Sequence, residues 1–174
     1  MTSDKLKMRL EQHQIKMLRL EALHCFSGVA SELKLCESDV QVLTIYDRSF
    51  SERISNIQSD YFFAWPLGSS NKFQRCGTYT DIADLAALVN AGISEIGIGV
   101  DDPGSVFLHC ETTSYAVEIP AQVFLKNSGT ILEYLWQLSS KDYNSCVYVL
   151  PESRQWFFLV GTEKSATFDL AVNP

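Results

Sequence analysis

The chain contains 174 residues, of which 46% are hydrophobic and 20% are charged, and its formal net charge is −7 at pH 7. This length suits one domain spanning residues 1–174, and the composition excludes a disordered chain, which needs low hydrophobicity and high charge. No apolar run approaches the roughly 18–20 residues that span a bilayer, and the polar N-terminus lacks the apolar stretch of a secretory signal, so we expect a cytoplasmic protein without membrane contact.

The first predicted element is a helix over residues 4–35, because apolar residues recur there at spacings of three and four. One apolar stripe contains Ile15, Leu18, Ala22, Phe26, Val29 and Leu33. An adjoining row contains Leu6, Leu10, Met17 and Leu20. A glycine within a helix costs about 1 kcal/mol relative to alanine, so Ser27 and Gly28 predict a kink or a break. The charged start of the helix is expected to project from the domain.

Two strands are predicted next. Residues 40–46 are rich in β-branched side chains, which favour a strand, and residues 47–49 follow as a turn. Residues 61–65 are continuously apolar and aromatic, which indicates a buried strand. Pro66 ends that strand, and a loop follows it. Residues 50–57 have no clear pattern.

A second helix is predicted over residues 81–90, with Thr78 or Thr80 as its cap. Asp81 and Asp84 suit the positive end of a helix dipole. Gly92 is expected to end the helix in a left-handed conformation. Residues 93–100 are then predicted to form a strand with two glycines.

A hairpin and a third helix follow. The sequence Asp101-Asp102-Pro103-Gly104 is a strong turn signal. Residues 106–111 and 115–119 are predicted to pair as strands around a short turn. A helix is predicted over residues 130–139, where Thr130 and Glu133 have the spacing of a capping box.

The C-terminal part predicts three strands, at residues 146–150, 156–160 and 167–172. Their connections are too short for parallel crossovers, so the strands must form an antiparallel meander. Trp156, Phe158 or both should pack into the core, with Phe157 on the opposite face. Strands that come in runs rather than alternating with helices indicate an α+β fold, in which helices pack on one face of an antiparallel sheet.

The cysteines and histidines predict neither a disulfide nor a metal site. The five cysteines are an odd, scattered set: Cys25, Cys36, Cys76, Cys110 and Cys146. Such a set is a poor disulfide framework, and reduced cysteines often pack as small hydrophobic residues. The neighbouring pairs at 24–25 and 109–110 resemble zinc ligands at first sight. Adjacent side chains point in different directions, however, and the spaced cysteine pairs of zinc sites are missing.

No cofactor or catalytic motif is present. The segment Gly97-Ile98-Gly99 lacks the third glycine and the following helix of a dinucleotide site, so no cofactor is expected. No serine lies in a nucleophile elbow. His109 and Glu111 share one face of a predicted strand, and such a pair can act in acid–base catalysis. An ordinary polar pair between strands is the simpler interpretation.

The clearest functional signal is the distribution of charge. Residues 76–125 contain seven acidic residues and no lysine or arginine, whereas the chain on either side is nearly neutral. The acidic residues are Asp81, Asp84, Glu95, Asp101, Asp102, Glu111 and Glu118. A field of one sign attracts partners of the opposite charge and repels nucleic acid. It can also serve only to keep the protein soluble.

In size, acidity and absence of catalytic motifs, the chain resembles small acidic bacterial toxin-immunity proteins. This resemblance implies a cytoplasmic, non-catalytic protein whose carboxylates bind a basic toxin domain. We therefore expect a basic protein partner, bound through the seven acidic residues, and no nucleic acid. A secretion chaperone for an effector is an alternative of the same class. A small enzyme that uses His109 and Glu111 is an alternative of another class.

Overall fold

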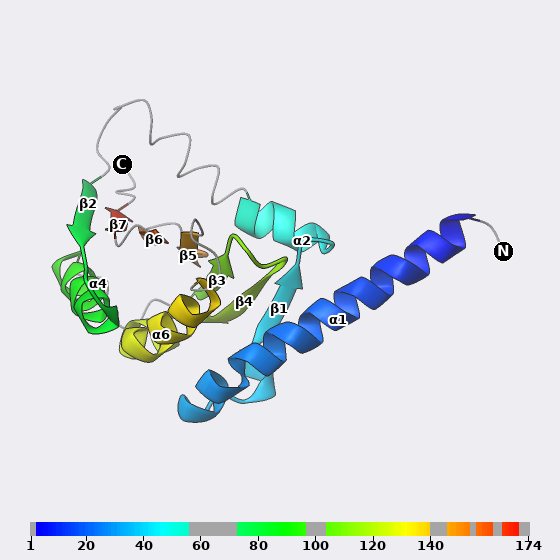
Figure 1. Ribbon diagram of the computed structural model, residues 1–174, viewed down its shortest axis with the longest axis horizontal. Coiled ribbons are helices and arrows are strands. Elements are labelled where there is room, and N and C mark those ends of the chain that lie inside the picture. The colour runs from blue at the N-terminus through cyan, green and yellow to red at the C-terminus, as the bar shows by residue number, and fades with distance from the viewer. Residues whose placement is uncertain are drawn as a thin grey trace.

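The strands form one antiparallel sheet. The computed structural model describes residues 3–55, 73–96, 104–139, 146–153, 156–161 and 165–170. Within these ranges the strands are β1 Gln41–Thr44, β2 Phe73–Thr78, β3 Ser105–Cys110, β4 Tyr115–Pro120, β5 Cys146–Pro151, β6 Trp156–Gly161 and β7 Ser165–Leu170. They lie in the order β1-β4-β3-β5-β6-β7-β2, and every neighbouring pair is antiparallel (Figure 1).

Helices cover both faces of the sheet unequally. The longer helices are α1 Ser3–Glu32, α4 Ile82–Ile96, α5 Ala121–Lys126 and α6 Ser128–Ser139. Their apolar side chains share one core cluster with the sheet, which confirms the α+β prediction. Three shorter helical elements also lie among the described residues: a 3-10 turn over Glu37–Asp39, α2 over Arg48–Phe50 and a π turn over Ser51–Ser55. Phe50 and Ile54 pack on the opposite face.

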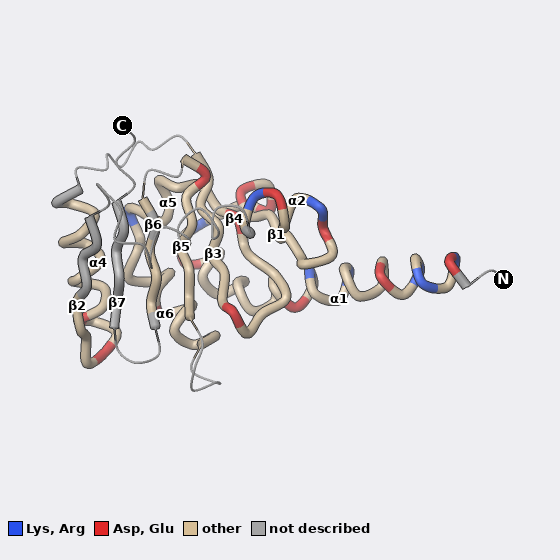
Figure 2. The backbone as a smooth tube through the Cα atoms, turned by 90° about the horizontal axis from the view of Figure 1, so that it is seen from above, with Lys and Arg blue, Asp and Glu red and all other residues tan. Residues whose placement is uncertain are grey.

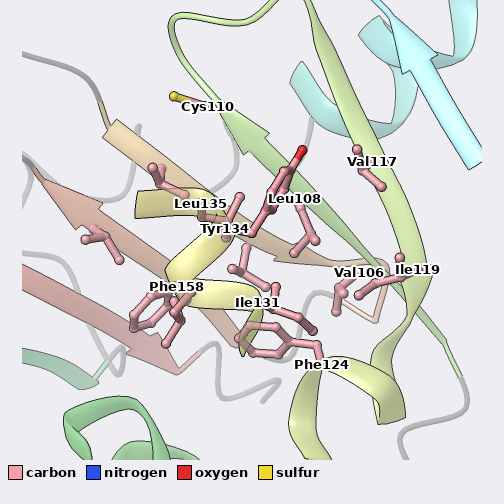
Figure 3. Packing of buried hydrophobic residues seen from close by; sticks show 14 of the residues in the cluster. Val106, Leu108, Cys110, Val117, Ile119, Phe124, Ile131, Tyr134, Leu135 and Phe158 are labelled. Carbon is pink, nitrogen blue, oxygen red and sulfur yellow. The ribbon is translucent and has the colours of Figure 1, made fainter. Parts of the chain in front are cut away.

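Alternation of side chains along the strands separates the two core clusters. In β3, Val106 and Leu108 point towards the longer helices, whereas Phe107 packs on the side of α2, as the two-residue period of a strand requires. Figure 3 shows side chains of the first cluster, where Ile131 and Leu135 of α6 lie among the strand residues. Buried leucine and isoleucine side chains each contribute about 1.5–3 kcal/mol through removal from water.

The C-terminal meander is confirmed. Strands β5, β6 and β7 pair in sequence order, and each pair is antiparallel. Trp156 and Phe158 are both buried, and the Trp156 ring stacks on Phe124 of α5 with 5.8 Å between ring centroids. The predicted hairpin of β3 and β4 is also confirmed. The side chain of Phe157 lies outside the described residues.

Helix α4 is longer than predicted. It continues through Gly92 to Ile96, so the prediction of a helix end at Gly92 and of a strand from residue 93 is wrong over residues 93–96. Gly92 is buried, and Ile93 packs against the core cluster. Packing of the apolar face therefore outweighs the tendency of glycine to end a helix, which is worth only about 1 kcal/mol.

Helix α1 is continuous through Ser27 and Gly28, so the predicted break is absent. Phe26 and Val29, on either side of the glycine, both pack on the core and hold this turn in helical form. The helix ends where Lys34 adopts a left-handed backbone with φ 55°. The amide of Leu35 then donates to the Ala30 carbonyl at 2.9 Å, which satisfies a terminal carbonyl group.

Several elements differ from the predictions in other ways. Strand β2, helix α2 and helix α5 are additions to the predicted set. Helix α6 begins at Ser128, and the hydroxyl of Thr130 donates to Glu32 of α1 at 3.1 Å, so the predicted capping box is wrong. The strand predicted over residues 61–65 lies outside the described residues.

Candidate partner-binding surface

The sheet topology brings two acidic positions to one edge. In an antiparallel sheet the end of one strand lies beside the start of its neighbour, so β2 and β3 both end at the edge where β5 and β7 begin. Asp81 follows β2, and Glu111 follows β3. Four steps between strands separate β3 from β2, which amounts to about 19 Å. We call Asp81, Asp84 and Glu111 the acidic edge.

Asp81 and Asp84 also cap helix α4. Both side chains are exposed. The Asp81 carboxylate accepts a hydrogen bond from the Asp84 amide at 2.9 Å, and the Asp84 carboxylate accepts bonds from the hydroxyl and the amide of Thr80. The bonds from Thr80 lower the pKa of Asp84. These two residues therefore have a structural role, and the bonds favour the charged form of Asp84.

Glu111 is held in place by β5. Its amide donates to the Cys146 carbonyl at 3.0 Å, and its exposed carboxylate accepts bonds from the Tyr148 hydroxyl and from the Cys146 amide. Burial raises the pKa of Tyr148, and the bond to Glu111 raises it further. Tyr148 therefore acts as a proton donor that fixes the carboxylate at the surface.

Glu118 is not part of the acidic edge. It lies in β4 on the face covered by α2, and it is only 7% exposed. Arg53 of the π turn binds both of its oxygens, at 2.9 and 2.7 Å. The same guanidinium bonds to Glu152 at 3.0 Å and lies 4.6 Å from the centre of the Phe107 ring. The expectation that Glu118 is an exposed carboxylate is therefore wrong.

Among the other predicted acidic residues, Glu95 is placed away from the acidic edge. Glu95 lies near the C-terminal end of α4, about 21 Å along the helix from Asp81, and its side chain is not described. Asp101 and Asp102 lie outside the described residues. Figure 2 shows acidic residues at several separate places on the described chain. Among the described carboxylates of the acidic stretch, Asp81, Asp84 and Glu111 thus lie at one edge, whereas Glu118 is separate and neutralised.

His109 is buried between aromatic rings. Its exposed fraction is 8%, its ring stacks on Tyr148, and it contacts Phe50 edge-on. Nδ1 lies 2.9 Å from the carbonyl oxygen of Tyr115, which requires Nδ1 to carry a proton. Burial lowers the pKa of His109, although the bond to Tyr115 and the charge of Glu111 oppose this effect. Tyr148 of β5 thus contacts both residues, because its ring stacks on His109 and its hydroxyl donates to Glu111.

The described cysteines have separate environments. Cys25, Cys36, Cys110 and Cys146 are free thiols, and within the described ranges no group of three or more ligating side chains could hold a metal ion. Cys36 donates to the Asp39 carboxylate at 2.6 Å. Burial raises the pKa of the Cys146 thiol, and the charge of Glu111 adds to the effect. This environment favours an uncharged thiol, which is a weak nucleophile.

Nothing in the sequence indicates that Arg53 binds Glu118. Arg53 lies in residues 50–57, which have no clear helical or strand pattern, and its partner Glu118 is 65 residues away. Lack of basic residues in 76–125 identifies the acidic stretch, but it gives no sign that an arginine from another segment neutralises one member.

Comparison with models of known families, with curated proteins and with solved structures gives no match. Among the helices of the described residues, none has the length and apolar character to cross a lipid bilayer. The candidate surface therefore rests on geometry and charge alone.

Proposed function

We propose that this chain is a non-catalytic binding protein that neutralises a basic protein partner through the acidic edge, and that it acts as an immunity protein against a toxin domain. The observation that carries the proposal is the common position of Asp81, Asp84 and Glu111. All three side chains are exposed at the same edge of the sheet. They come from a stretch of fifty residues without any lysine or arginine.

The dimensions of the acidic edge suit a protein partner better than a small ligand. Its two ends are about 19 Å apart, which exceeds the Debye length of about 8 Å at physiological salt. The ends therefore act as separate charged contacts rather than as one chelating site. A protein interface of standard size, about 800 Å² on each partner, can span both ends.

Acid–base catalysis by His109 and Glu111 is the less favoured candidate. A general base has to reach the proton that it removes, whereas His109 is packed between two aromatic rings and bonded to a backbone carbonyl. Glu111 is engaged by Tyr148 and by the Cys146 amide. These contacts support a structural role for the pair.

A growth-rescue assay tests the proposal. The proposal predicts that the gene of this chain lies beside a gene for a large toxin polypeptide. The C-terminal domain of that polypeptide is the probe, expressed in a bacterial host with and without this chain. We expect the domain to stop growth and co-expression of this chain to restore it. Growth arrest that persists despite soluble expression of this chain would overturn the immunity function.

Matched variants test the surface. Asp81→Asn, Asp84→Asn and Glu111→Gln together remove three charges while keeping hydrogen-bonding side chains at the cap of α4 and beside Tyr148. The triple variant should rescue growth less well than the native chain. Glu37→Gln, which removes one exposed charge from the 3-10 turn outside the acidic edge, should rescue growth fully. Equal rescue by the triple variant would contradict the assignment of the acidic edge.

A further inference from the structure

Helix α1 has two apolar faces, of which the sheet covers only one. Ala22 and Phe26 are fully buried against the body, and Leu18 and Val29 pack beside them. A second stripe, which we call the outer stripe, consists of Leu6, Leu10, His13, Met17, Leu20 and His24. At about 100° per residue, the outer stripe lies roughly opposite the buried one. The sequence interpretation of an adjoining row is therefore wrong.

The outer stripe is accessible to a partner. Leu6, Leu10, Met17 and Leu20 are between 51% and 56% exposed. From Asp4 to Gln14, every side chain except Glu11 is exposed, and Ala22 is the first buried residue of the helix. Figure 1 shows the N-terminal half of α1 extending away from the sheet.

The projecting half of α1 lacks the packing that normally stabilises a helix. An isolated helix shorter than about 12–15 residues is marginal in water. The part before Ile15 is about this long, and none of its described side chains is buried. Arg19 marks the start of that anchored half, since it bonds to Asp47 at 2.9 Å. A partner on the outer stripe would stabilise the projecting turns.

The spacing of the outer stripe is that of a coiled coil. Its members are separated by four, three, four, three and four residues, which places them at the a and d positions of successive heptads. Because the same stripe exists on every copy of the chain, it is self-complementary. The buried stripe lies opposite, so the bodies of two copies would sit on the outer sides of a helix pair.

Charge complementarity selects the orientation. With Leu10 and Met17 at a positions, Lys16 is at g and Glu21 at the following e position. In a parallel pair each g residue faces the e residue five positions further along the other helix, so Lys16 meets Glu21 twice. In an antiparallel pair Glu21 would face Lys7, but Lys16 would face Lys16 of the other copy, so the parallel pair is the arrangement that avoids this contact between like charges. The parallel arrangement also lets His13 meet His13 of the other copy, where one imidazole can donate to the other.

We propose that the outer stripe of α1 is a self-association surface, through which two copies of this chain form a parallel, two-stranded coiled coil. The inference is independent of the acidic edge, because it uses different residues. In such a dimer the projecting halves of the two α1 helices form a stalk, and the two bodies lie together at one end of it.

The molar mass of the full chain in solution tests the proposal. Sedimentation equilibrium over a wide range of concentrations should give twice the 19.6 kDa of one chain. Leu10→Glu should weaken association at least about a hundredfold, because each dimer then loses two buried leucine side chains. Met8→Glu is the matched control, since Met8 is 59% exposed but lies at an f position, away from the partner. The mass of a single chain at every concentration, or equal weakening by both variants, would overturn the proposal.

A charge exchange tests the orientation. Glu21→Lys should weaken the dimer by placing two lysines at each Lys16 contact, and adding Lys16→Glu should restore it. In an antiparallel pair Glu21 would face Lys7 instead. Rescue by Lys7→Glu and not by Lys16→Glu would therefore contradict the parallel arrangement. Far-ultraviolet circular dichroism of each variant at high concentration will show that the fold is retained.

Discussion

Arg53 is the cation that neutralises Glu118 on the smaller face of the sheet. The Glu118 side chain is 9% exposed and the Arg53 side chain is 32% exposed. The guanidinium also covers the ring of Phe107, so its aliphatic stem and its charge both contribute to packing. Removal of either partner of such a pair leaves a buried charge without compensation.

We expect Arg53→Met to lower the free energy of unfolding by about 2 kcal/mol, which is less than the 3–5 kcal/mol of a fully buried pair because water reaches part of Arg53. Urea denaturation will measure the change. Adding Glu118→Gln should recover most of the loss, because the uncompensated charge is then absent. A double variant as unstable as Arg53→Met would show that packing rather than charge is responsible.

His109 should make the stability of the protein depend on pH. Burial lowers the pKa of His109 from its ordinary 6.5, so the unfolded chain binds a proton at a higher pH than the folded chain does. The contribution of this residue is complete above pH 6.5 and is lost as the pH falls from 6.5 towards the lower pKa of the folded state. Urea denaturation at several values in this window should show the slope. His109→Gln should reduce it.

At the scale of elements, two glycines have opposite roles. A methyl group on Gly77 of β2 would lie 2.5 Å from Cδ2 and 2.7 Å from Cδ1 of Leu88 in α4. These distances are shorter than van der Waals contact, so Leu88 occupies the space that a side chain at position 77 would need. Gly28 of α1 has open space around the corresponding position. The close approach of β2 to α4 therefore depends on Gly77.

We expect Gly77→Ala to lower the free energy of unfolding by about 1–3 kcal/mol through overpacking, and Gly28→Ala to raise it by about 0.5–1 kcal/mol. Thermal and urea denaturation will measure both. In a double-mutant cycle with Leu88→Ala, the effect of Gly77→Ala should be much smaller. Equal effects in both backgrounds would show that Leu88 is not the obstacle.

Local patterns account for the elements that the sequence predicts correctly. The strands of the meander are rich in aliphatic and aromatic residues and are joined by short connections, so pairing is determined over a few residues. Strand β2, with the sequence FQRCGT, has no such pattern, and its partner β7 is 87 to 97 residues away (from 78 to 165 and from 73 to 170). A local preference also fails at Gly92, where packing of α4 against the core continues a helix that glycine tends to end.

The candidate site was predictable only in part, for the same reason. The acidic stretch is visible in the sequence, and Asp81, Asp84 and Glu111 are exposed as expected. Glu118 is different because Arg53, 65 residues away, neutralises it. A run of charges along the chain shows where carboxylates occur, but strand pairing decides which face they occupy and which cation they meet.

At the scale of the whole molecule, the acidic edge should act mainly on the rate of encounter with a partner. Exposed charges steer association and are screened by salt. Replacement of Asp81 and Asp84 by Asn should slow association with the proposed basic partner at low ionic strength, and the difference should shrink as salt rises. Surface plasmon resonance will measure the rates. An association rate that is unchanged at low salt would show that Asp81 and Asp84 only cap α4 and do not steer a partner.

The position of β2 at the edge of the sheet has a consequence for synthesis of the chain on the ribosome. Its neighbour in the sheet is β7, the last strand among the described residues, so β2 emerges long before the strand that it pairs with. Strands β3, β4 and β5 can assemble earlier, since their pairings span shorter stretches of chain. The side of the sheet that carries β2 and the acidic edge near Asp81 can close only after β7 has left the exit tunnel, and the loop that must close is long. A nascent chain would therefore expose the edge of β6 to solvent until β7 leaves the exit tunnel.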